Sequence, residues 1–215
     1  MTKVDKIPEP TIKRLAFYSR PLEDLLESGP PVISSERLAD LCGVHPAQVR
    51  KDLAYFGEFG VRGVGYDVRD LLHEIKRILA TDKAMPLCIV GVGNLGTSLI
   101  ENENFRKRGY VFKAAFDSDP EKQGQKLSCG LIIEPNQRIR EVCRERDIEI
   151  GVIATPRHGA QRVCNLLLDA GVRGILNLAP VQVRTSGAFK AENVDFTVKL
   201  ENLAYHLHRL DESDG

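Results

Sequence analysis

The sequence predicts an α/β protein in which a small helical domain with a β-hairpin precedes a doubly wound parallel sheet. Two short helix patterns joined by a tight turn lie near the N-terminus, and a glycine-rich hairpin pattern follows them at 57–68. An apolar run then breaks into GVGNLG, which opens an alternation of strand and helix patterns. We therefore expect a winged helix-turn-helix domain at 1–80, a Rossmann domain at 86–197, and a C-terminal dimerisation helix and tail at 198–215.

The composition supplies no charge argument for a partner. Of the 215 residues, 30 are Lys or Arg and 30 are Asp or Glu, so net charge predicts neither DNA nor an anionic membrane as a ligand. No apolar run approaches the roughly 20 residues that span a bilayer, and the start MTKVDKIPEP lacks the apolar core of a signal peptide. The five cysteines are scattered singly, which argues against a disulfide framework or a metal site. We expect a cytoplasmic protein.

Helix patterns dominate the first domain. The segment 10–27 has apolar residues near helical spacing, and Pro21 is expected to kink or divide it. Either Ser34 or Ser35 is a good N-cap for a helix at 36–42, Gly43 ends that helix, and Pro46 opens a third one. Two short helices joined by a tight turn that contains glycine form a helix-turn-helix pattern.

One face of the third helix is predicted to contact DNA. Val49, Leu53 and Phe56 recur at helical spacing and should pack on the other helices. The opposite face carries side chains that suit base edges or phosphates, namely Gln48, Arg50, Lys51 and Tyr55. A solvated face of a small helical bundle is the alternative interpretation.

The hairpin that follows this helix favours DNA binding, because a hairpin in that place is a wing. Apolar residues alternate on both sides of a glycine-rich tip. Arg62 is placed to enter a narrow minor groove, and the glycines let the tip approach a sugar-phosphate backbone. The predicted DNA contacts therefore also include Arg62, Gly63 and Tyr66. A helix at 70–80 and a linker at 81–86 follow.

The motif GVGNLG has the spacing of a phosphate-binding turn between a strand at 87–90 and a helix. Gly91 makes the turn, Gly93 leaves room for a pyrophosphate, and Gly96 lets the helix pack closely on the strand. The free N–H groups and positive dipole end of that helix then receive the phosphates. The predicted cofactor loop also contains Val92, Asn94 and Leu95. The alternative is that these glycines form only a turn.

An acid follows the next predicted strand where a dinucleotide fingerprint places one. The strand at 110–116 ends at Asp117, about 20 residues beyond the third glycine. A carboxylate there accepts hydrogen bonds from the ribose hydroxyls and repels a 2′-phosphate, so NAD(H) is favoured over NADP(H). The alternative is that Asp117 only caps the turn at 118–120.

The remaining patterns continue the alternation. We expect strands at 131–133 and 148–154, a strand and loop over 174–180, and a last strand at 193–196. Helices are expected at 138–146, 160–169 and 198–210. Thr155 and Pro156 follow a strand and are the natural second wall of the cofactor site. His158 is interpreted as a cap or surface residue, so no catalytic residue is assigned. The last helix has an apolar face that either covers its own sheet or docks on a partner subunit.

Five segments together resemble the Rex family of redox-sensing transcriptional repressors, over nearly the whole chain. They are AQVRKDLAYFGEFGVRGVGYDV at 47–68, GVGNLG at 91–96, AAFDSDPEK at 114–122, GILNLAP at 174–180 and NVDF at 193–196. The resemblance implies a winged helix that binds DNA, a Rossmann domain that senses the NADH/NAD⁺ ratio, and a homodimer that exchanges its C-terminal helices. It also implies a charge contact between Arg20 and Asp195 that links the two domains in the DNA-competent form. Phe196 is implied near the nicotinamide pocket of the dimer.

The hypothesis that follows is a homodimeric repressor rather than an enzyme. In this hypothesis the protein binds a palindromic operator in double-stranded DNA when NADH is low, and it dissociates when NADH occupies the Rossmann domains, with NAD⁺ as the competitor. The oxidised nicotinamide is cationic and resists desolvation, whereas the neutral reduced ring can enter an apolar pocket. Two alternatives stay open: an NAD-dependent oxidoreductase, and a DNA-binding protein whose Rossmann domain only dimerises.

Overall fold

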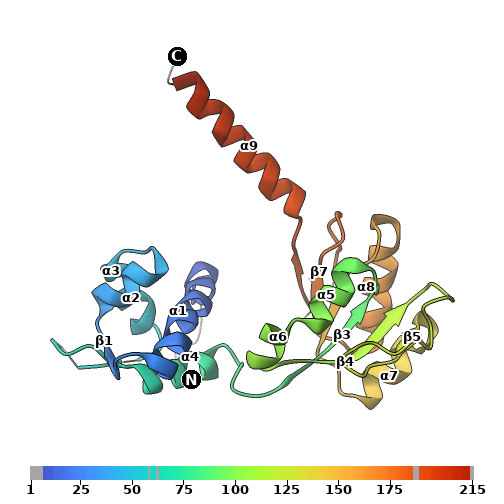
Figure 1. Ribbon diagram of the computed structural model, residues 1–215, viewed down its shortest axis with the longest axis horizontal. Coiled ribbons are helices and arrows are strands. Elements are labelled where there is room, and N and C mark those ends of the chain that lie inside the picture. Colours follow the sequence, from blue (N-terminus) through green and yellow to red (C-terminus); the bar gives the residue numbers. More distant parts are fainter. Residues whose placement is uncertain (1–6, 58, 62, 186–188, 214–215) are drawn as a thin grey trace. The chain divides into compact units, whose positions relative to one another are not determined.

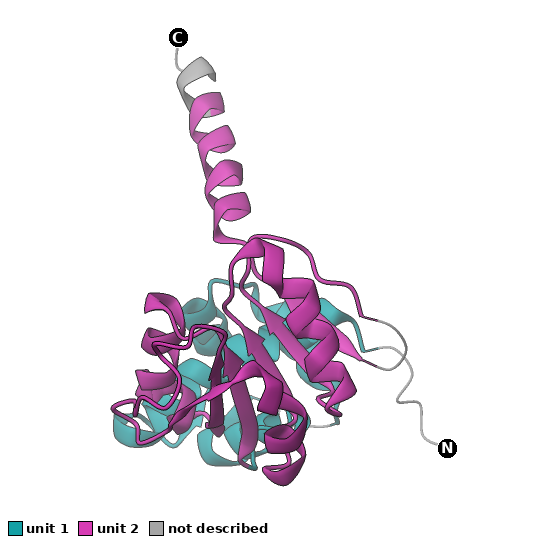
Figure 2. Ribbon diagram, turned by 90° about the vertical axis from the view of Figure 1, so that its right-hand side faces the viewer, with its two compact units in different colours: residues 1–83 teal, residues 84–215 magenta. Residues whose placement is uncertain are grey.

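A computed structural model describes residues 7–57, 59–61, 63–185 and 189–213. The chain divides into two units, residues 1–83 and residues 84–215, which we call unit 1 and unit 2 (Figure 2). Unit 1 is mostly helical, whereas unit 2 is built on a sheet (Figure 1). Within the described ranges, no helix is both long and apolar enough to cross a membrane.

Unit 1 is a helical bundle with a small two-stranded sheet. Its helices are α1 (Glu9–Ser28), α2 (Ser35–Cys42), α3 (Pro46–Ala54) and α4 (Val68–Ile78). Ser34 caps α2 by accepting the Arg37 N–H, and Gly43 ends α2 in the left-handed region with a φ of 64°. The apolar stripes of the helices meet in one core, which includes Leu15, Leu38, Val49, Leu71 and Ile75.

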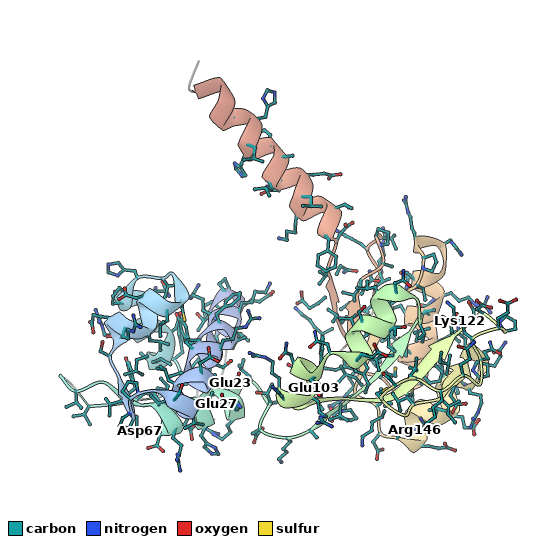
Figure 3. The ribbon with its side chains drawn as sticks, in the orientation of Figure 1. Glu23, Glu27, Asp67, Glu103, Lys122 and Arg146 are labelled. Atoms are coloured by element: carbon teal, nitrogen blue, oxygen red, sulfur yellow. The ribbon has the colours of Figure 1, made fainter. Side chains whose placement is uncertain are left out.

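The first helix continues through Pro21 as one helix, so division at this proline, one of the two expected outcomes, is wrong. A proline cannot donate a hydrogen bond to the carbonyl four residues earlier, which here is that of Phe17. The Cys42 thiol donates to this carbonyl instead, with the sulfur 3.8 Å from the oxygen. Contacts with α4 also support α1. Glu23, which is labelled on α1 in Figure 3, pairs with Lys76 of α4 at 2.9 Å.

The wing differs from the predicted hairpin. Its return strand β2 (Tyr66–Asp67) pairs antiparallel with β1 (Val32–Ile33), which lies between α1 and α2. Closer to the tip, the outgoing and return segments meet in a bridge between Val61 and Gly65. A side chain on Gly65 would begin 2.5 Å from the Ile33 carbonyl oxygen, so this approach requires glycine. The alternation at 57–68 could not reveal β1 as the partner, because β1 precedes α2 in the chain.

Unit 2 contains, in its described part, a six-stranded parallel sheet with the order β5-β4-β3-β6-β7-β8. The strands are β3 (Met85–Val90), β4 (Tyr110–Asp117), β5 (Ile133–Pro135), β6 (Ile150–Ile153), β7 (Gly174–Asn177) and β8 (Lys190–Asn193). The chain runs from β3 outward to β5 and then returns to the other side of β3 at β6. The strand order therefore reverses between β3 and β6, and ligands of such sheets bind at that reversal.

Helices cover both faces of this sheet. They are α5 (Asn94–Glu101), α6 (Glu103–Lys107), α7 (Ile139–Glu145) and α8 (Ala160–Asp169), with short 3₁₀ turns η1 (Asn136–Arg138) and η2 (Arg157–Gly159). Cys88 and Val90 of β3 belong to the core that α7 and α8 cover, whereas Leu87 and Ile89 pack with α5. A central strand that is apolar at every position is thus buried on both faces.

The C-terminal segment corrects one prediction. The last strand ends at Asn193, so a strand over 193–196 is wrong, and α9 (Phe196–Ser213) begins where that strand was expected to end. Asp195 explains this start, because its Oδ1 accepts hydrogen bonds from the Thr197 N–H at 2.9 Å and hydroxyl at 2.5 Å. Phe196 and Leu203 are 58% and 55% exposed, and Figure 1 shows α9 extending away from the sheet of its own unit. The helix therefore does not cover that sheet.

Candidate nucleotide pocket and DNA-contact face

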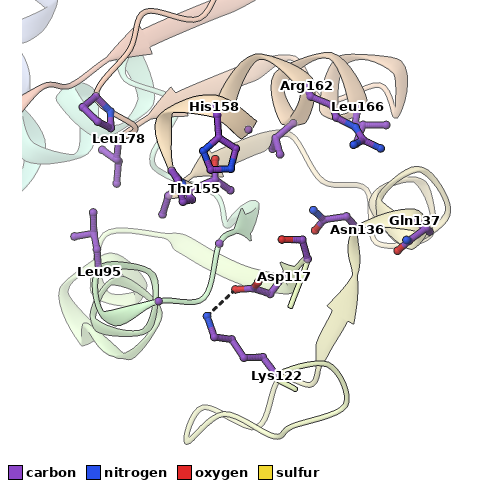
Figure 4. Close-up of a pocket in the computed structure, with 18 of the residues that line it drawn as sticks. Leu95, Asp117, Lys122, Asn136, Gln137, Thr155, His158, Arg162, Leu166 and Leu178 are labelled. Carbon is purple, nitrogen blue, oxygen red and sulfur yellow. Dashed lines mark hydrogen bonds and ion pairs between the residues drawn. The ribbon is translucent and has the colours of Figure 1, made fainter. Parts of the chain in front are cut away.

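A pocket of about 860 Å³ opens at the carboxyl ends of the strands in unit 2 (Figure 4). Gly91 and Gly93 follow β3, Asp117 ends β4, Thr155 follows β6, and Leu178 follows β7. These four strands are neighbours around the reversal of strand order. The pocket therefore lies where a doubly wound sheet binds its ligand.

The glycine motif forms a close-packed turn with one open position. Gly91 has a φ of +100°, and a side chain there would begin 2.6 Å from the Ala154 carbonyl oxygen. A side chain on Gly96 would strike the carbonyl oxygen of Gly91. By contrast, nothing lies within 4 Å of the place where a side chain on Gly93 would begin. This open position at the N-terminus of α5 leaves room for a phosphate beside free N–H groups.

Asp117 connects two loops at the centre of the pocket. Its Oδ2 accepts the Val92 N–H at 2.8 Å, and its Oδ1 accepts the Asp119 N–H at 2.9 Å. Lys122 lies 3.3 Å from Oδ2 (Figure 4). Burial raises the pKa of Asp117, but the two N–H groups and the Lys122 charge outweigh it and hold that pKa below its usual value. The carboxylate thus caps the turn after β4 and is also ionised in the pocket.

Two polar atoms in the pocket wall have no hydrogen-bond partner among the described residues. They are Oγ1 of Thr155 and Oδ1 of Asn136, and both are buried. Each residue lines the pocket. Because buried polar atoms are almost always paired, these two fit a pocket that holds a polar ligand or ordered water.

A buried amide shapes the wall at the other end of the pocket. Asn177, which ends β7, is fully buried, and its Nδ2 donates to the Val181 carbonyl at 2.6 Å and to Asn193 Oδ1 at 2.9 Å. Its own Oδ1 accepts the Ala179 N–H at 3.1 Å. These bonds hold the loop whose Leu178 and Pro180 line the pocket, and they tie it to the end of β8.

The structure brings most of the predicted cofactor residues to this pocket. The predicted residues that line it are Gly91, Gly93, Leu95, Asp117, Thr155 and Pro156. Val92 and Gly96 are buried beneath the turn, and Asn94 opens α5. Phe196 lies in α9 and is not among the residues that line the pocket of this chain. His158 lines the pocket as an exposed residue.

Sequence reasoning missed part of the wall. The missed residues include Lys122, Asn136, Arg140, Arg162 and Leu166. The strand order could have indicated all of these except Lys122, since η1 and α7 follow β5, the neighbour of β4, and α8 follows β6, the neighbour of β3. Lys122 lies in the segment after β4. The sequence alone does not establish which strand lies beside β4.

The predicted DNA face of α3 is exposed in part. Arg50, Lys51 and Tyr55 are exposed, and Arg50 donates to Ser35 Oγ at 2.8 Å and to Glu36 Oε1 at 3.0 Å. Gly63 is exposed near the wing tip with a φ of +83°. Arg62 lies outside the described residues.

Two residues predicted to read DNA have structural partners instead. Gln48 is half-buried, and its Nε2 donates to Asp52 Oδ1 at 2.9 Å. Tyr66 is only 8% exposed and packs in the core of unit 1. The alternation of the wing places the Tyr66 ring on the inner face of β2, and the contact of Tyr66 with DNA stays a prediction.

A buried carboxylate holds α3 against α1. Asp52 is fully buried and accepts hydrogen bonds from Arg14 Nε at 2.5 Å, Tyr18 hydroxyl at 2.8 Å and Thr11 hydroxyl at 3.0 Å, in addition to Gln48. Burial raises the pKa of Asp52, but these donors, Arg14 foremost, outweigh it and lower that pKa. We call Asp52 and the four side chains that donate to it the Asp52 hub. This hub holds α3, the second helix of the helix-turn-helix, against α1 through an internal ion pair.

The chain matches known families in both units. Residues 6–54 match the family model described as "Putative DNA-binding protein N-terminus", and residues 82–181 match the model of the CoA binding domain. The redox-sensing transcriptional repressor Rex of Syntrophobacter fumaroxidans is 55% identical over 205 residues, which cover 95% of this chain and 98% of that protein. The Rex of Solidesulfovibrio magneticus is 46% identical over 205 residues, covering 95% and 93% of the two chains.

Solved structures agree with these matches. The Rex-family repressor RSP in complex with β-NAD⁺ and operator DNA is 31% identical, with a TM-score of 0.91 over 98% of this chain and 96% of RSP. RSP in complex with β-NADH is 30% identical, with a TM-score of 0.86 over 98% of each chain.

The fold and the two sites define a class: a DNA-binding protein with a winged helix-turn-helix unit and a nucleotide-binding Rossmann unit. With relatives of this identity over almost its whole length, the chain belongs to the Rex family of redox-sensing transcriptional repressors. The expected family and fold class are thereby confirmed, and the family consists of regulators.

Asp52→Asn tests the hub. Leaving Arg14 without its buried partner should lower the free energy of unfolding of unit 1 by about 3–5 kcal/mol at pH 7. Because the pKa of Asp52 is lowered on folding, the stability it confers is present above about pH 4 and is lost as pH falls through the lowered pKa. The free energies of unfolding of the wild type and the Asp52→Asn variant should therefore converge at low pH. Thermal unfolding with hydrogen exchange of α1 and α3 measures both effects.

Asp40→Asn is the matched control, since Asp40 is an exposed acid on α2 and should change little. Equal stability of the Asp52 and Asp40 variants at pH 7 would contradict a structural role for the hub.

Proposed function

We propose that this chain is a homodimeric repressor that binds a palindromic operator when NADH is low and releases it when NADH occupies unit 2. The observation that carries the proposal is the presence, in one chain, of an exposed cationic face on α3 and a glycine-lined pocket with an ionised acid. RSP, its relative, has been solved with β-NADH, and with β-NAD⁺ and operator DNA together. These complexes favour the sensing interpretation over a Rossmann unit that only dimerises.

The pocket residues fit a dinucleotide from end to end. The open space at Gly93 would take the pyrophosphate, and Asp117 would accept hydrogen bonds from the adenosine ribose hydroxyls. The side chains of Leu95 and Leu178 line the end of the pocket away from Lys122 (Figure 4). Pro180 follows Leu178 by two residues and also lines the pocket, and these three side chains would enclose the nicotinamide. An apolar wall favours the neutral reduced ring over the cationic oxidised ring, because the cation loses more hydration free energy there.

The acid in the pocket selects among adenine nucleotides. Coenzyme A carries a phosphate on the 3′-oxygen of its adenosine ribose, and NADPH carries one on the 2′-oxygen. An ionised Asp117 beside that ribose repels both phosphates. The proposal is therefore NADH, although residues 82–181 match the CoA binding domain.

A second copy of the chain is proposed as the partner of α9. Phe196, Leu200, Leu203 and Leu207 recur at helical spacing, and each is more than half exposed. Burying this face between subunits removes apolar surface from water and places two winged helices at one palindrome. Exchange of α9 between subunits is part of this proposal.

The contact between Arg20 and Asp195 is also proposed, as a link between unit 1 and unit 2 in the DNA-bound form. Arg20 is exposed and lies over the Phe17 ring, 5.4 Å from its centroid. The hydroxyl of Thr197 lowers the pKa of Asp195, which keeps this exposed acid ionised while it caps α9. An ion pair to Asp195 would thus act directly on the start of α9.

Arg50→Ala and Lys51→Ala test the DNA face. Each should weaken operator binding by about 1–3 kcal/mol and lower the slope of log K against log salt by about one, because one cation leaves the interface. Gel shift at several salt concentrations measures this, and NADH affinity should stay unchanged. Arg144→Ala, which removes an exposed cation from α7, is the control; an equal loss with this variant would assign the effect to total charge.

Asp117→Ala tests the cofactor site. Loss of a charged acceptor for the ribose hydroxyls should weaken NADH binding about tenfold or more, so that operator release needs more NADH. Without its ion pair to Asp117, Lys122 should be able to bind the 2′-phosphate of NADPH, so the ratio of the affinities for NADH and NADPH should fall. NADH fluorescence titration measures both affinities. Asp119→Ala is the control, since Asp119 does not line the pocket; unchanged NADH binding in the Asp117 variant would remove the cofactor assignment.

Leu203→Glu tests dimerisation through α9. A charge inside the proposed interface should produce monomers in sedimentation velocity and, with them, a large loss of operator affinity, because a monomer reads only half a palindrome. Glu201→Lys changes a charge on the opposite side of the same helix and should leave the dimer intact. A dimeric Leu203→Glu protein would place the interface elsewhere.

A further inference from the structure

We propose that Asn136 recognises the adenine base of the dinucleotide and so restricts the sensor to adenine nucleotides. This inference rests on the proposed binding of NADH. Its starting point is the unpaired Oδ1 of Asn136, one of two buried polar side-chain atoms without a partner among the described residues. The other is Oγ1 of Thr155, in the wall of the same pocket.

The strand order places Asn136 at the adenine end of the pocket. Gly93 follows β3 and marks the phosphates, and Asp117 ends β4 and marks the ribose. The next strand outward is β5, which pairs with β4 through Asp117 and Pro135, and Asn136 follows it directly. Moving along the sheet edge from β3 to β5, a ligand would therefore place phosphate, ribose and base in that order.

The surroundings of Asn136 suit a purine ring. Figure 4 shows the Asn136 amide directed into the pocket on the side of Asp117, with Leu95 and Leu178 at the other end. Val163 and Leu166 of α8 also line the pocket and provide an apolar wall for a flat base. The site thus combines an apolar wall with a buried, unpaired amide oxygen, which is an arrangement that fixes the orientation of a bound ring.

An amide matches adenine in hydrogen-bonding pattern. Its oxygen accepts from the 6-amino group, and its N–H₂ group donates to a neighbouring ring nitrogen, as in the pairing of Asn with adenine in DNA. Hypoxanthine has a 6-oxo group in place of the amine, so the same amide oxygen would face another acceptor. Asn136 therefore prefers adenine to a base of the same shape.

A purely structural role for this side chain would use its oxygen within the protein. Asn136 is the first residue of η1, where such an oxygen commonly caps N–H groups of the turn. Oδ1 makes no such bond in the described structure and is buried, so burial without a ligand would cost free energy. The orphan oxygen is explained by a donor that arrives with the ligand.

Binding of NADH and of its reduced hypoxanthine analogue to the full-length protein tests the proposal. The wild type should bind NADH about tenfold more tightly than the analogue, which is the effect of one well-placed hydrogen bond. Asn136→Leu should lose about tenfold in NADH affinity and bind both dinucleotides alike. Asn136→Asp, which keeps the acceptor, should retain the preference for NADH. Isothermal titration calorimetry measures the affinities, and thermal unfolding checks that the variants fold.

Asn104→Leu is the matched control, because Asn104 is an exposed amide on α6 that does not line the pocket. It should keep the wild-type preference for NADH. A preference that survives in Asn136→Leu, or a wild type that binds both dinucleotides equally, overturns the role of Asn136 while NADH binding stands. Failure of the wild type to bind either dinucleotide overturns the proposed function as well.

Discussion

Asp117 accepts the N–H groups of Val92 and Asp119, and one carboxylate thereby joins the turn after β3 to the turn after β4. The remaining geometry of the pocket depends on this junction. Gly91 can turn back against the Ala154 carbonyl only because it has no side chain, and Gly96 brings α5 against Gly91 for the same reason. With these contacts fixed, Gly93 is left facing open space, so a rigid loop presents a vacant position to a ligand.

In unit 1 a second buried carboxylate, that of Asp52, fixes the position of α3. A recognition helix of nine residues offers little apolar surface of its own. Asp52 accepts hydrogen bonds from four side chains of α1 and α3, in addition to the apolar contacts of Val49 and Leu53. A buried ion pair contributes little net stability to a fold, but removing one of its partners lowers the free energy of unfolding by about 3–5 kcal/mol. The hub therefore fixes the position of α3 more than it stabilises the unit, which is the property that docking into a groove requires.

The sequence predicted the features that depend on local pattern. Three glycines at fixed spacing, an apolar strand before them and an acid after the next strand were sufficient to locate the loop and Asp117. Features that depend on distant partners were missed: β1 pairs with β2 across two helices, and Asn136 reaches the pocket only through the order of strands.

Helical spacing likewise placed Gln48 on the outer face of α3. It could not show that an aspartate at position 52, between the apolar residues of that helix, is buried and takes the Gln48 amide as a partner. Helical periodicity assigns apolar residues to the buried face and polar residues to the exposed face. It therefore assigns a buried polar residue with long-range partners, such as Asp52, to the wrong face. The same limit applies to Tyr66, which the wing pattern included among the predicted DNA contacts and whose ring packs in the core of unit 1.

Redox sensing places a further demand on this architecture. A ligand shifts an equilibrium between two forms only by its different affinity for them, and turning 99:1 into 1:99 takes about 5.5 kcal/mol of difference. Contacts of Asp117 and Asn136 with the adenosine half would be the same for NADH and NAD⁺, so they add affinity without discrimination. In the proposed function, the difference in affinity between NADH and NAD⁺ arises at the end lined by Leu178 and Pro180. That loop is held by Asn177, which bonds Asn193 at the end of β8, two residues before the Asp195 cap of α9. The wall that would meet the nicotinamide is thus joined by a pair of side-chain amides to the segment from which the exposed helix begins.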